Sequence, residues 1–321
     1  MSVVQLSEIS LSYGRQPILE SIDLSVDWGE YLVVLGASGC GKTSLLRMIA
    51  GLVMPTAGEI RLFGENAQTL APRNRKVALV PQQAGLYPHL TVRKSISLGI
   101  REKLSRPDLA KRIREAASIV ELDEMLDRLP QQLSGGQLRR AAVAKAIASR
   151  APIRLLDEPL SAVDASLRFP IESDLRSLHD ATPGVTIHVT HDGAEAKRMA
   201  TRIAVIENGS ISQVGTYEEI ESAPTTPGVA AVLGSSRFIT HAMRRAESNW
   251  TSPDGIQVVG PDAKVGTKAT LGYFESDQVP MDADGESRND PVDCDWVDAK
   301  AGIVVSEQRL RWFVESDSES P

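Results

Sequence analysis

The sequence predicts an α/β protein with a largely parallel sheet, a helical insertion and a small C-terminal β domain. Three observations predict this class. Short apolar runs, typical of buried strands, alternate with segments of helical periodicity. A glycine-rich loop joins one of these strands to a helix, and a helix-rich stretch without strands interrupts the alternation. After about residue 235 the pattern changes to short strand-like pieces between Asp, Gly and Pro turns.

The expected strands and helices follow one another along residues 1–235. Residues 31–35 (YLVVL) form a continuous apolar run ending at Gly36, as a buried parallel strand does. Further strands are expected at 3–12, 18–26, 77–80, 153–156, 185–189 and 203–206. Helical spacing occurs at 42–51, 108–121, 136–149, 166–179 and 193–200. Arg154 interrupts the apolar run 153–156, which is unusual for a central buried strand.

Two domains are expected. Residues 1–235 form the first, with a helical subdomain at about 83–151 and a short helix at 228–240 packing back on it. Residues 236–321 form a small β-rich domain with an acidic tail, ESDSESP. Its strand-like pieces are GIQVV, KATLGYF, AGIVV and RLRWFV.

Composition excludes several classes of protein. The 321 residues carry 35 Lys and Arg against 42 Asp and Glu, a net charge of −7, which suits a soluble protein and argues against general nucleic-acid binding. Cys40 and Cys294 alone predict no disulfide framework. The N-terminus has no secretory pattern, and no apolar run approaches the roughly 18–20 residues that cross a bilayer. We therefore expect a cytoplasmic protein that reaches any membrane through a partner.

Residues 36–43 (GASGCGKT) match the phosphate-loop pattern G-x-x-x-x-G-K-S/T between a strand and a helix. Its glycines let successive N–H groups face the phosphates, and the following helix adds its positive end. Lys42 is expected to reach the β- and γ-phosphates, and the Thr43 hydroxyl to bind Mg²⁺. The residues expected to bind the nucleotide here are Gly36, Ser38, Gly39, Cys40, Gly41, Lys42, Thr43 and Ser44.

Residues 153–158 (IRLLDE) supply the second half of this site. A strand ending in Asp157 places a carboxylate near Mg²⁺, as the second element of a phosphate-loop enzyme requires. Glu158 follows at once and points elsewhere, where a carboxylate can polarise the attacking water as general base. ATP and Mg²⁺ are therefore the expected cofactors.

Residues 133–137 (LSGGQ) resemble the signature of ABC ATPases, and they lie between the two phosphate-loop elements as in that family. Other family elements occur in order. Tyr13 resembles the aromatic residue that stacks on adenine, and Gln82 resembles the glutamine that senses the γ-phosphate and Mg²⁺. Asp164, in SAVD, resembles part of the loop that crosses the dimer interface. His191, in VTHD, resembles the switch histidine that contacts the γ-phosphate.

The resemblance, which covers roughly residues 3–235, implies a head-to-tail dimer with two ATP molecules between the chains. Ser134, Gly135, Gly136 and Gln137 then close the ATP held by the phosphate loop of the second chain, most simply an identical one. It further implies permease partners, an indirect link to a solute-binding protein, and a peripheral place at the cytoplasmic face of the membrane. Gln83 is the alternative to Gln82 as the sensing glutamine.

Two segments, LYPHLTV and DEPLSAVDASLR, and the β-rich extension resemble the importer branch that serves sugars, which carries an OB-like regulatory domain. Carbohydrate is the favoured cargo, with iron, sulfate, polyamine and glycerol-phosphate as alternatives. A soluble ABC ATPase of DNA repair or translation is the competing function. The single phosphate loop and the lack of a long heptad run argue against it. A third possibility is a regulatory nucleotide-binding module without ATPase activity. The presence of all the expected catalytic and metal-binding residues argues against it, namely Lys42, Asp157, Glu158 and His191.

Overall fold

The computed structural model describes residues 2–82, 86–161, 165–181 and 184–234, and eight strands between residues 238 and 314. The chain divides into two compact units, Met1–Tyr217 and Glu218–Pro321. The sequence placed this boundary later, at residue 235. No helix among the described residues is long and apolar enough to cross a membrane.

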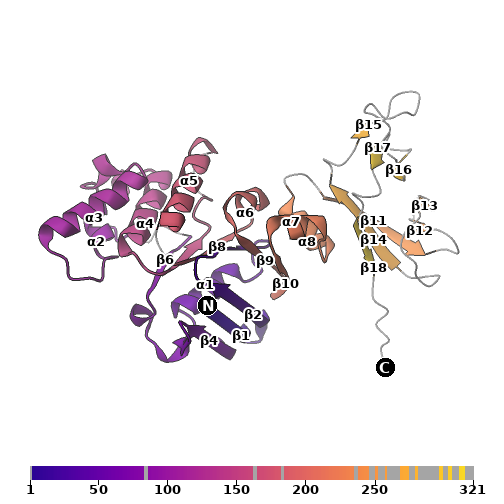
Figure 1. Ribbon diagram of the computed structural model, residues 1–321, viewed down its shortest axis with the longest axis horizontal. Helices are drawn as coiled ribbons and strands as arrows, with labels where there is room; N and C mark the ends of the chain where they lie inside the picture. The colour runs from indigo at the N-terminus through magenta and orange to yellow at the C-terminus, as the bar shows by residue number, and fades with distance from the viewer. Residues whose placement is uncertain are drawn as a thin grey trace. The chain divides into compact units, whose positions relative to one another are not determined.

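A six-stranded sheet forms the centre of the first unit, in the order β10-β9-β3-β8-β7-β6 (Figure 1). Neighbouring strands from β9 to β6 are parallel, and only β10 runs antiparallel to its neighbour. The predicted α/β class with a largely parallel sheet is confirmed. The strands are β3 (Tyr31–Leu35), β6 (Val77–Val80), β7 (Ile153–Asp157), β8 (Val185–Thr190), β9 (Arg202–Glu207) and β10 (Ser210–Gly215).

Every residue of β3, β7 and β8 is buried, which explains the continuous apolar run of β3. Strands β7 and β8 also bury polar side chains. Arg154 is buried with them, and its guanidinium has polar neighbours inside the core. Its Nε donates to Thr186 Oγ1 over 3.1 Å, and one Nη lies 3.3 Å from His179 Nδ1. Burial lowers the pKa of Arg154. The charge within this strand is thus accommodated by two polar side chains from neighbouring elements.

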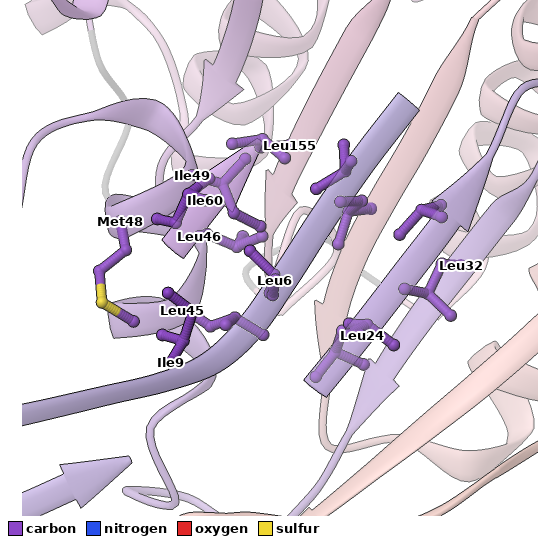
Figure 2. Close-up of a cluster of buried hydrophobic side chains, with 14 of the residues drawn as sticks. Leu6, Ile9, Leu24, Leu32, Leu45, Leu46, Met48, Ile49, Ile60 and Leu155 are labelled. Carbon is purple, nitrogen blue, oxygen red and sulfur yellow. The ribbon is translucent and has the colours of Figure 1, made fainter. Parts of the chain in front are cut away.

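An antiparallel sheet of order β2-β1-β4-β5 packs over helix α1 and the central sheet. Figure 2 shows Leu45, Leu46 and Ile49 of α1 beside Leu6 of β1 and Leu155 of β7. Burying these side chains fixes α1, and with it the loop that precedes the helix. The bounds are β1 (Ser2–Tyr13), β2 (Gln16–Asp27), β4 (Ala57–Leu62), β5 (Glu65–Asn66) and α1 (Lys42–Ala50).

The sequence predicted a helical subdomain at about 83–151, in the chain between β6 and β7. Its described part holds three helices and no strand: α2 (Val92–Ser97), α3 (Arg106–Ile119) and α4 (Gly135–Ser149). These helices pack on one another (Figure 1). The other helices are α5 (Ala165–Ala181), α6 (Gly193–Met199), α7 (Tyr217–Ser222) and α8 (Pro227–Leu233), and short 3₁₀ turns occur at 67–69, 72–74, 123–125 and 130–132.

The second unit contains two antiparallel sheets, β13-β12-β11-β14-β18 and β15-β17-β16. All four strand-like pieces of the sequence contain a strand, but the helix predicted at 228–240 was too long. It ends at Leu233, before Gly234, and Phe238–Arg245 forms β11 instead. The other strands are β12 (250–251), β13 (257–258), β14 (268–274), β15 (279–280), β16 (296–298), β17 (303–305) and β18 (311–314). The OB-like assignment stays a prediction.

Candidate active site

The loop between β3 and α1 requires glycine at three positions. Gly39 and Gly41 have φ values of 85° and 103°, which side chains rarely tolerate. A Cβ on Gly41 would lie 2.5 Å from Leu19 Cδ2, and one on Gly36 would lie 2.5 Å from the carbonyl oxygen of Ile206. The backbone therefore curls tightly, and Ser38 in the middle of the loop is exposed.

Helix α1 begins directly at this loop without a capping side chain. Gly41 is its N-cap residue, and no acidic residue lies in the first turn. The first N–H groups of a helix, here those of Lys42, Thr43 and Ser44, have no acceptor within the helix. Together with the positive end of the helix dipole they favour a bound anion. The start of α1 thus fits a phosphate group.

The Lys42 ammonium is held inside the loop. The side chain is 5% exposed, and its Nζ donates to the carbonyl oxygens of Gly36 and Ala37 over 2.7 and 2.8 Å. The Cys40 sulfur lies 3.9 Å from the same nitrogen. A positive charge therefore lies inside the loop at the start of α1, which suits the phosphates of a nucleotide.

Thr43 and Asp157 meet across the sheet edge. The Thr43 hydroxyl donates to Asp157 Oδ1 over 2.9 Å, from the first turn of α1 to the end of β7. Burial raises the pKa of the Asp157 carboxyl, while the hydrogen bond from Thr43 lowers it. A buried carboxylate beside a hydroxyl offers the hard oxygen ligands that Mg²⁺ prefers. Two of the three residues predicted from sequence to bind the metal, Thr43 and Asp157, therefore lie together. The third, Gln82, contacts Glu158 instead.

The Glu158 carboxylate joins the ends of three parallel strands. Gln82, just after β6, donates from Nε2 to Glu158 Oε2 over 2.9 Å. His191, just after β8, has its Nδ1 3.4 Å from Glu158 Oε1. Three residues predicted to be catalytic thus meet at one carboxylate. Gln83, the alternative to Gln82, lies outside the described residues.

The start of α4 forms a second exposed helix N-terminus. Ser134 is its N-cap: its Oγ accepts from the N–H of Gln137, whose own side chain accepts from the N–H of Ser134. Ser134 and Gly135 are exposed, and a Cβ on Gly135 would meet open space. This turn can therefore face a ligand on another molecule. The Gln137 side chain is engaged in the cap, and its predicted nucleotide contact stays a prediction.

Two further predicted residues are placed less completely. Tyr13 ends β1 with its side chain 51% exposed, so its ring is available for stacking. Asp164 lies outside the described residues.

Arg139 was missed by the sequence analysis, although its guanidinium donates to carbonyl groups around Glu158. Its position in an alanine-rich, hence buried, helix was the available indication that this charge has internal partners.

Comparisons with known proteins agree with this geometry. Residues 19–161 match the family model described as ABC transporter. The chain is 38% identical to the sn-glycerol-3-phosphate import ATP-binding protein UgpC of Ruegeria pomeroyi, covering 87% of this chain and 80% of that protein. It is 41% identical to the sulfate/thiosulfate import ATP-binding protein CysA of Caulobacter vibrioides, covering 73% of this chain and 71% of that protein.

Solved structures show the same fold. The dimeric structure of the bacterial ABC transporter cassette MJ0796 superposes with a TM-score of 0.62 and 30% identity, over 66% of this chain and 98% of that one. A post-hydrolysis state of the same cassette, bound to ADP and Pi, gives the same TM-score at 29% identity. The chain therefore belongs to the ABC transporter family, as an ATP-hydrolysing, ATP-binding subunit of the importer branch.

Proposed function

We propose that this chain hydrolyses MgATP at a site shared between two copies and thereby drives solute import through a permease. The observation that carries the proposal is the convergence of Gln82 and His191 on Glu158, beside the pair formed by Thr43 and Asp157. A carboxylate held between two polar groups can accept a proton from an attacking water. The adjacent hydroxyl–carboxylate pair and the phosphate loop fit the rest of the substrate.

The side chains divide the work as follows. Lys42 and the N–H groups at the start of α1 bind the β- and γ-phosphates, and Tyr13 stacks on adenine. Thr43, Asp157 and Gln82 hold Mg²⁺, which when bound neutralises charge that develops on the phosphates. Glu158 orients and deprotonates the water. His191, which is 54% exposed and beside Glu158, contacts the γ-phosphate.

The second copy supplies the other side of the nucleotide. The exposed turn at Ser134, Gly135 and Gly136 offers hydroxyl and N–H donors at the start of a 15-residue helix, a favourable place for an anion. The solved cassettes of similar fold are described as dimeric. We propose a homodimer in head-to-tail arrangement, bound to permease subunits at the cytoplasmic face of the membrane, with a solute-binding protein acting indirectly and no nucleic-acid partner.

Asp157→Asn tests whether Asp157 binds the metal, because its effect on the stability of the ligand-free protein can be measured apart from its effect on Mg²⁺ binding. Burial raises the folded-state pKa of Asp157, so the folded chain binds this proton more tightly than the unfolded chain. The ionised carboxylate therefore destabilises the fold at neutral pH, and this cost disappears as the pH falls through the raised pKa. We expect the variant without ligand to melt at or above the wild-type temperature at neutral pH, with the difference shrinking in acid.

The same melting experiment is repeated with MgATP. Bound ligand raises the free energy of unfolding of the wild-type protein by about 2.7 kcal/mol when ATP is present at a hundred times its dissociation constant. We expect the variant to gain no more from MgATP than from ATP with EDTA. A full Mg²⁺-dependent gain in Asp157→Asn would contradict the proposed metal site.

The cargo is tested by uptake. UgpC is named for sn-glycerol-3-phosphate import and CysA for sulfate and thiosulfate import. We propose a carbohydrate or related organic phosphate as cargo, with sulfate, iron and polyamine as alternatives. Inactivating the gene is expected to abolish uptake of one radiolabelled solute among glycerol-3-phosphate, maltose, sulfate, iron and spermidine, and a wild-type copy restores it. Unchanged uptake of solutes, together with a DNA-repair or translation defect, would favour the soluble ATPase alternative.

A further inference from the structure

The guanidinium of Arg139 lies among the backbone carbonyls around Glu158. The residue belongs to the N-terminal part of α4 and is 3% exposed. Its Nε donates to the carbonyl oxygen of Pro159 over 2.9 Å, one Nη to that of Pro81 over 3.3 Å, and the other Nη to that of Glu158. One side chain thus connects α4 to the segment after β6 and to the segment after β7.

Ser161 also binds the carbonyl oxygen of Glu158. Arg139 Nη2 donates to Ser161 Oγ over 3.0 Å, and that hydroxyl lies 3.1 Å from the Glu158 carbonyl oxygen, to which it donates. Burial lowers the pKa of Arg139, while the charges of Asp157 and Glu158 raise it. A buried cation is costly unless its donors are satisfied, and these acceptors satisfy them. The guanidinium is therefore held in one geometry.

Glu158 needs such support because its backbone is left-handed. Its φ is 46°, a conformation that a residue with a Cβ keeps only when its surroundings fix it. Val189 of β8 accepts a hydrogen bond from the Glu158 N–H over 3.0 Å, and Arg139 binds the Glu158 carbonyl. This turn lets consecutive carboxylates separate: Asp157 accepts from Thr43, and Glu158 lies between Gln82 and His191.

We propose that Arg139 is a positioning residue that fixes the left-handed peptide of Glu158 and couples the position of α4 to the Glu158 carboxylate. The inference rests on the proposed function, in which Glu158 is the base. The first turn of α4 is also the proposed contact to the ATP held by the partner chain. Engagement of Ser134 at one ATP therefore adjusts Glu158 at the other, through a single side chain.

Arg139→Met tests the inference. The variant and the wild-type protein are compared as dimers bound to the permease. We expect kcat for ATP hydrolysis to fall by about ten- to a hundredfold, since small misplacements of a catalytic group have such effects. The dissociation constant of a fluorescent ATP analogue is expected to be unchanged, because Lys42 and Thr43 are untouched. The Hill coefficient for ATP is expected to fall toward 1. Arg139→Lys, which keeps the charge but lacks the planar fork, should give an intermediate kcat.

Arg140→Met is the matched control. Arg140 is the next residue of α4, its side chain is 13% exposed, and it donates to the Val120 carbonyl over 3.1 Å, within the helical subdomain. We expect this variant to lose thermal stability and to keep its kcat per nucleotide-binding site. A wild-type kcat in Arg139→Met, or a loss that only follows the folded fraction, would overturn the inference.

The measurements also distinguish a failure of the Arg139 inference from a failure of the proposed function. If the methionine variant does not fold, Arg139→Lys decides: a wild-type kcat and Hill coefficient overturn the positioning role, and a reduced kcat with unchanged ATP binding supports it. If the wild-type complex itself does not hydrolyse ATP, the proposed function fails. If the wild type is active, Glu158→Gln is inactive and both Arg139 variants are normal, only the inference about Arg139 fails.

Discussion

Glu158→Gln is expected to reduce kcat for ATP hydrolysis by about 10²–10⁴-fold, the usual contribution of a general base. The carboxylate can take a proton from water, and an amide of the same size cannot. Gln82 can still donate to the oxygen that remains, so the strand ends keep their arrangement. We therefore expect wild-type affinity for ATP, and a melting temperature close to wild type, together with the lost rate in a steady-state phosphate-release assay.

Glu172→Gln provides the control for this variant. Glu172 is buried, helps line the same small cavity of about 70 Å³ as Glu158 and His191, and is paired with Arg198, which donates to it over 2.7 Å. Its loss is expected to lower stability while kcat per ATP-binding site stays at the wild-type level. A normal turnover rate in Glu158→Gln would show that another group activates the water.

The parts of the fold that followed from the sequence are those fixed by local pattern. Residues 31–35 are a continuous apolar run because β3 is covered on both faces. Residues 185–189 of β8 are buried as well, although Thr186 and His188 lie among their apolar neighbours. The loop at 36–41 could be placed between strand and helix because its backbone requires glycine, which the sequence shows directly. Alternation of strands and helices then gave the parallel sheet.

The errors occurred where partners are distant in sequence. The charge of Arg154 looked misplaced within a strand because Thr186 and His179, which receive it, belong to later elements. Arg139 was missed for the same reason, since the carbonyls that it binds come from other segments. The helix predicted at 228–240 was too long because apolar periodicity continued past Gly234, where pairing with β14 determines a strand instead.

In the candidate site too, local features could be predicted from the sequence, and contacts between distant residues could not. The phosphate loop follows from spacing alone, but Gln82 and Glu158 are 76 residues apart, and nothing local to either residue predicts their contact. Family resemblance supplied the order of the elements. The parallel sheet supplies the proximity, because β6, β7 and β8 end at the same edge, where Gln82, Glu158 and His191 follow them. Of the residues that support this arrangement, Arg139 belongs to no motif recognised in the sequence. Ser161 was recognised only as the start of SAVD, and nothing local predicts its contact with the Glu158 carbonyl.

A mixture of two inactive variants tests the shared site. Lys42→Met removes the cation of the phosphate loop, which donates to Gly36 and Ala37. Gly135→Asp places a carboxylate at the exposed start of α4, facing open space in the single chain, so it repels nucleotide without disturbing the fold. Each homodimer then has two defective sites, and we expect each variant alone to be inactive.

Subunit exchange between these variants is expected to restore activity. In a mixed head-to-tail dimer one site combines both defects, and the other combines an intact Lys42 with an intact Ser134–Gly136 turn. Random pairing makes half of the dimers mixed, each with one good site, so recovery reaches at most about a quarter of the wild-type rate, and less where the two sites are coupled. Two variants of the same phosphate loop, Lys42→Met and Thr43→Val, are the matched control. Every dimer formed from them has two defective loops, so neither site is intact and no activity is expected to return. No recovery in the first mixture, with exchange verified by differently tagged chains, would contradict the shared site. Full activity of Gly135→Asp alone would mean that each chain hydrolyses ATP without a partner's turn, and that the exposed start of α4 has another use.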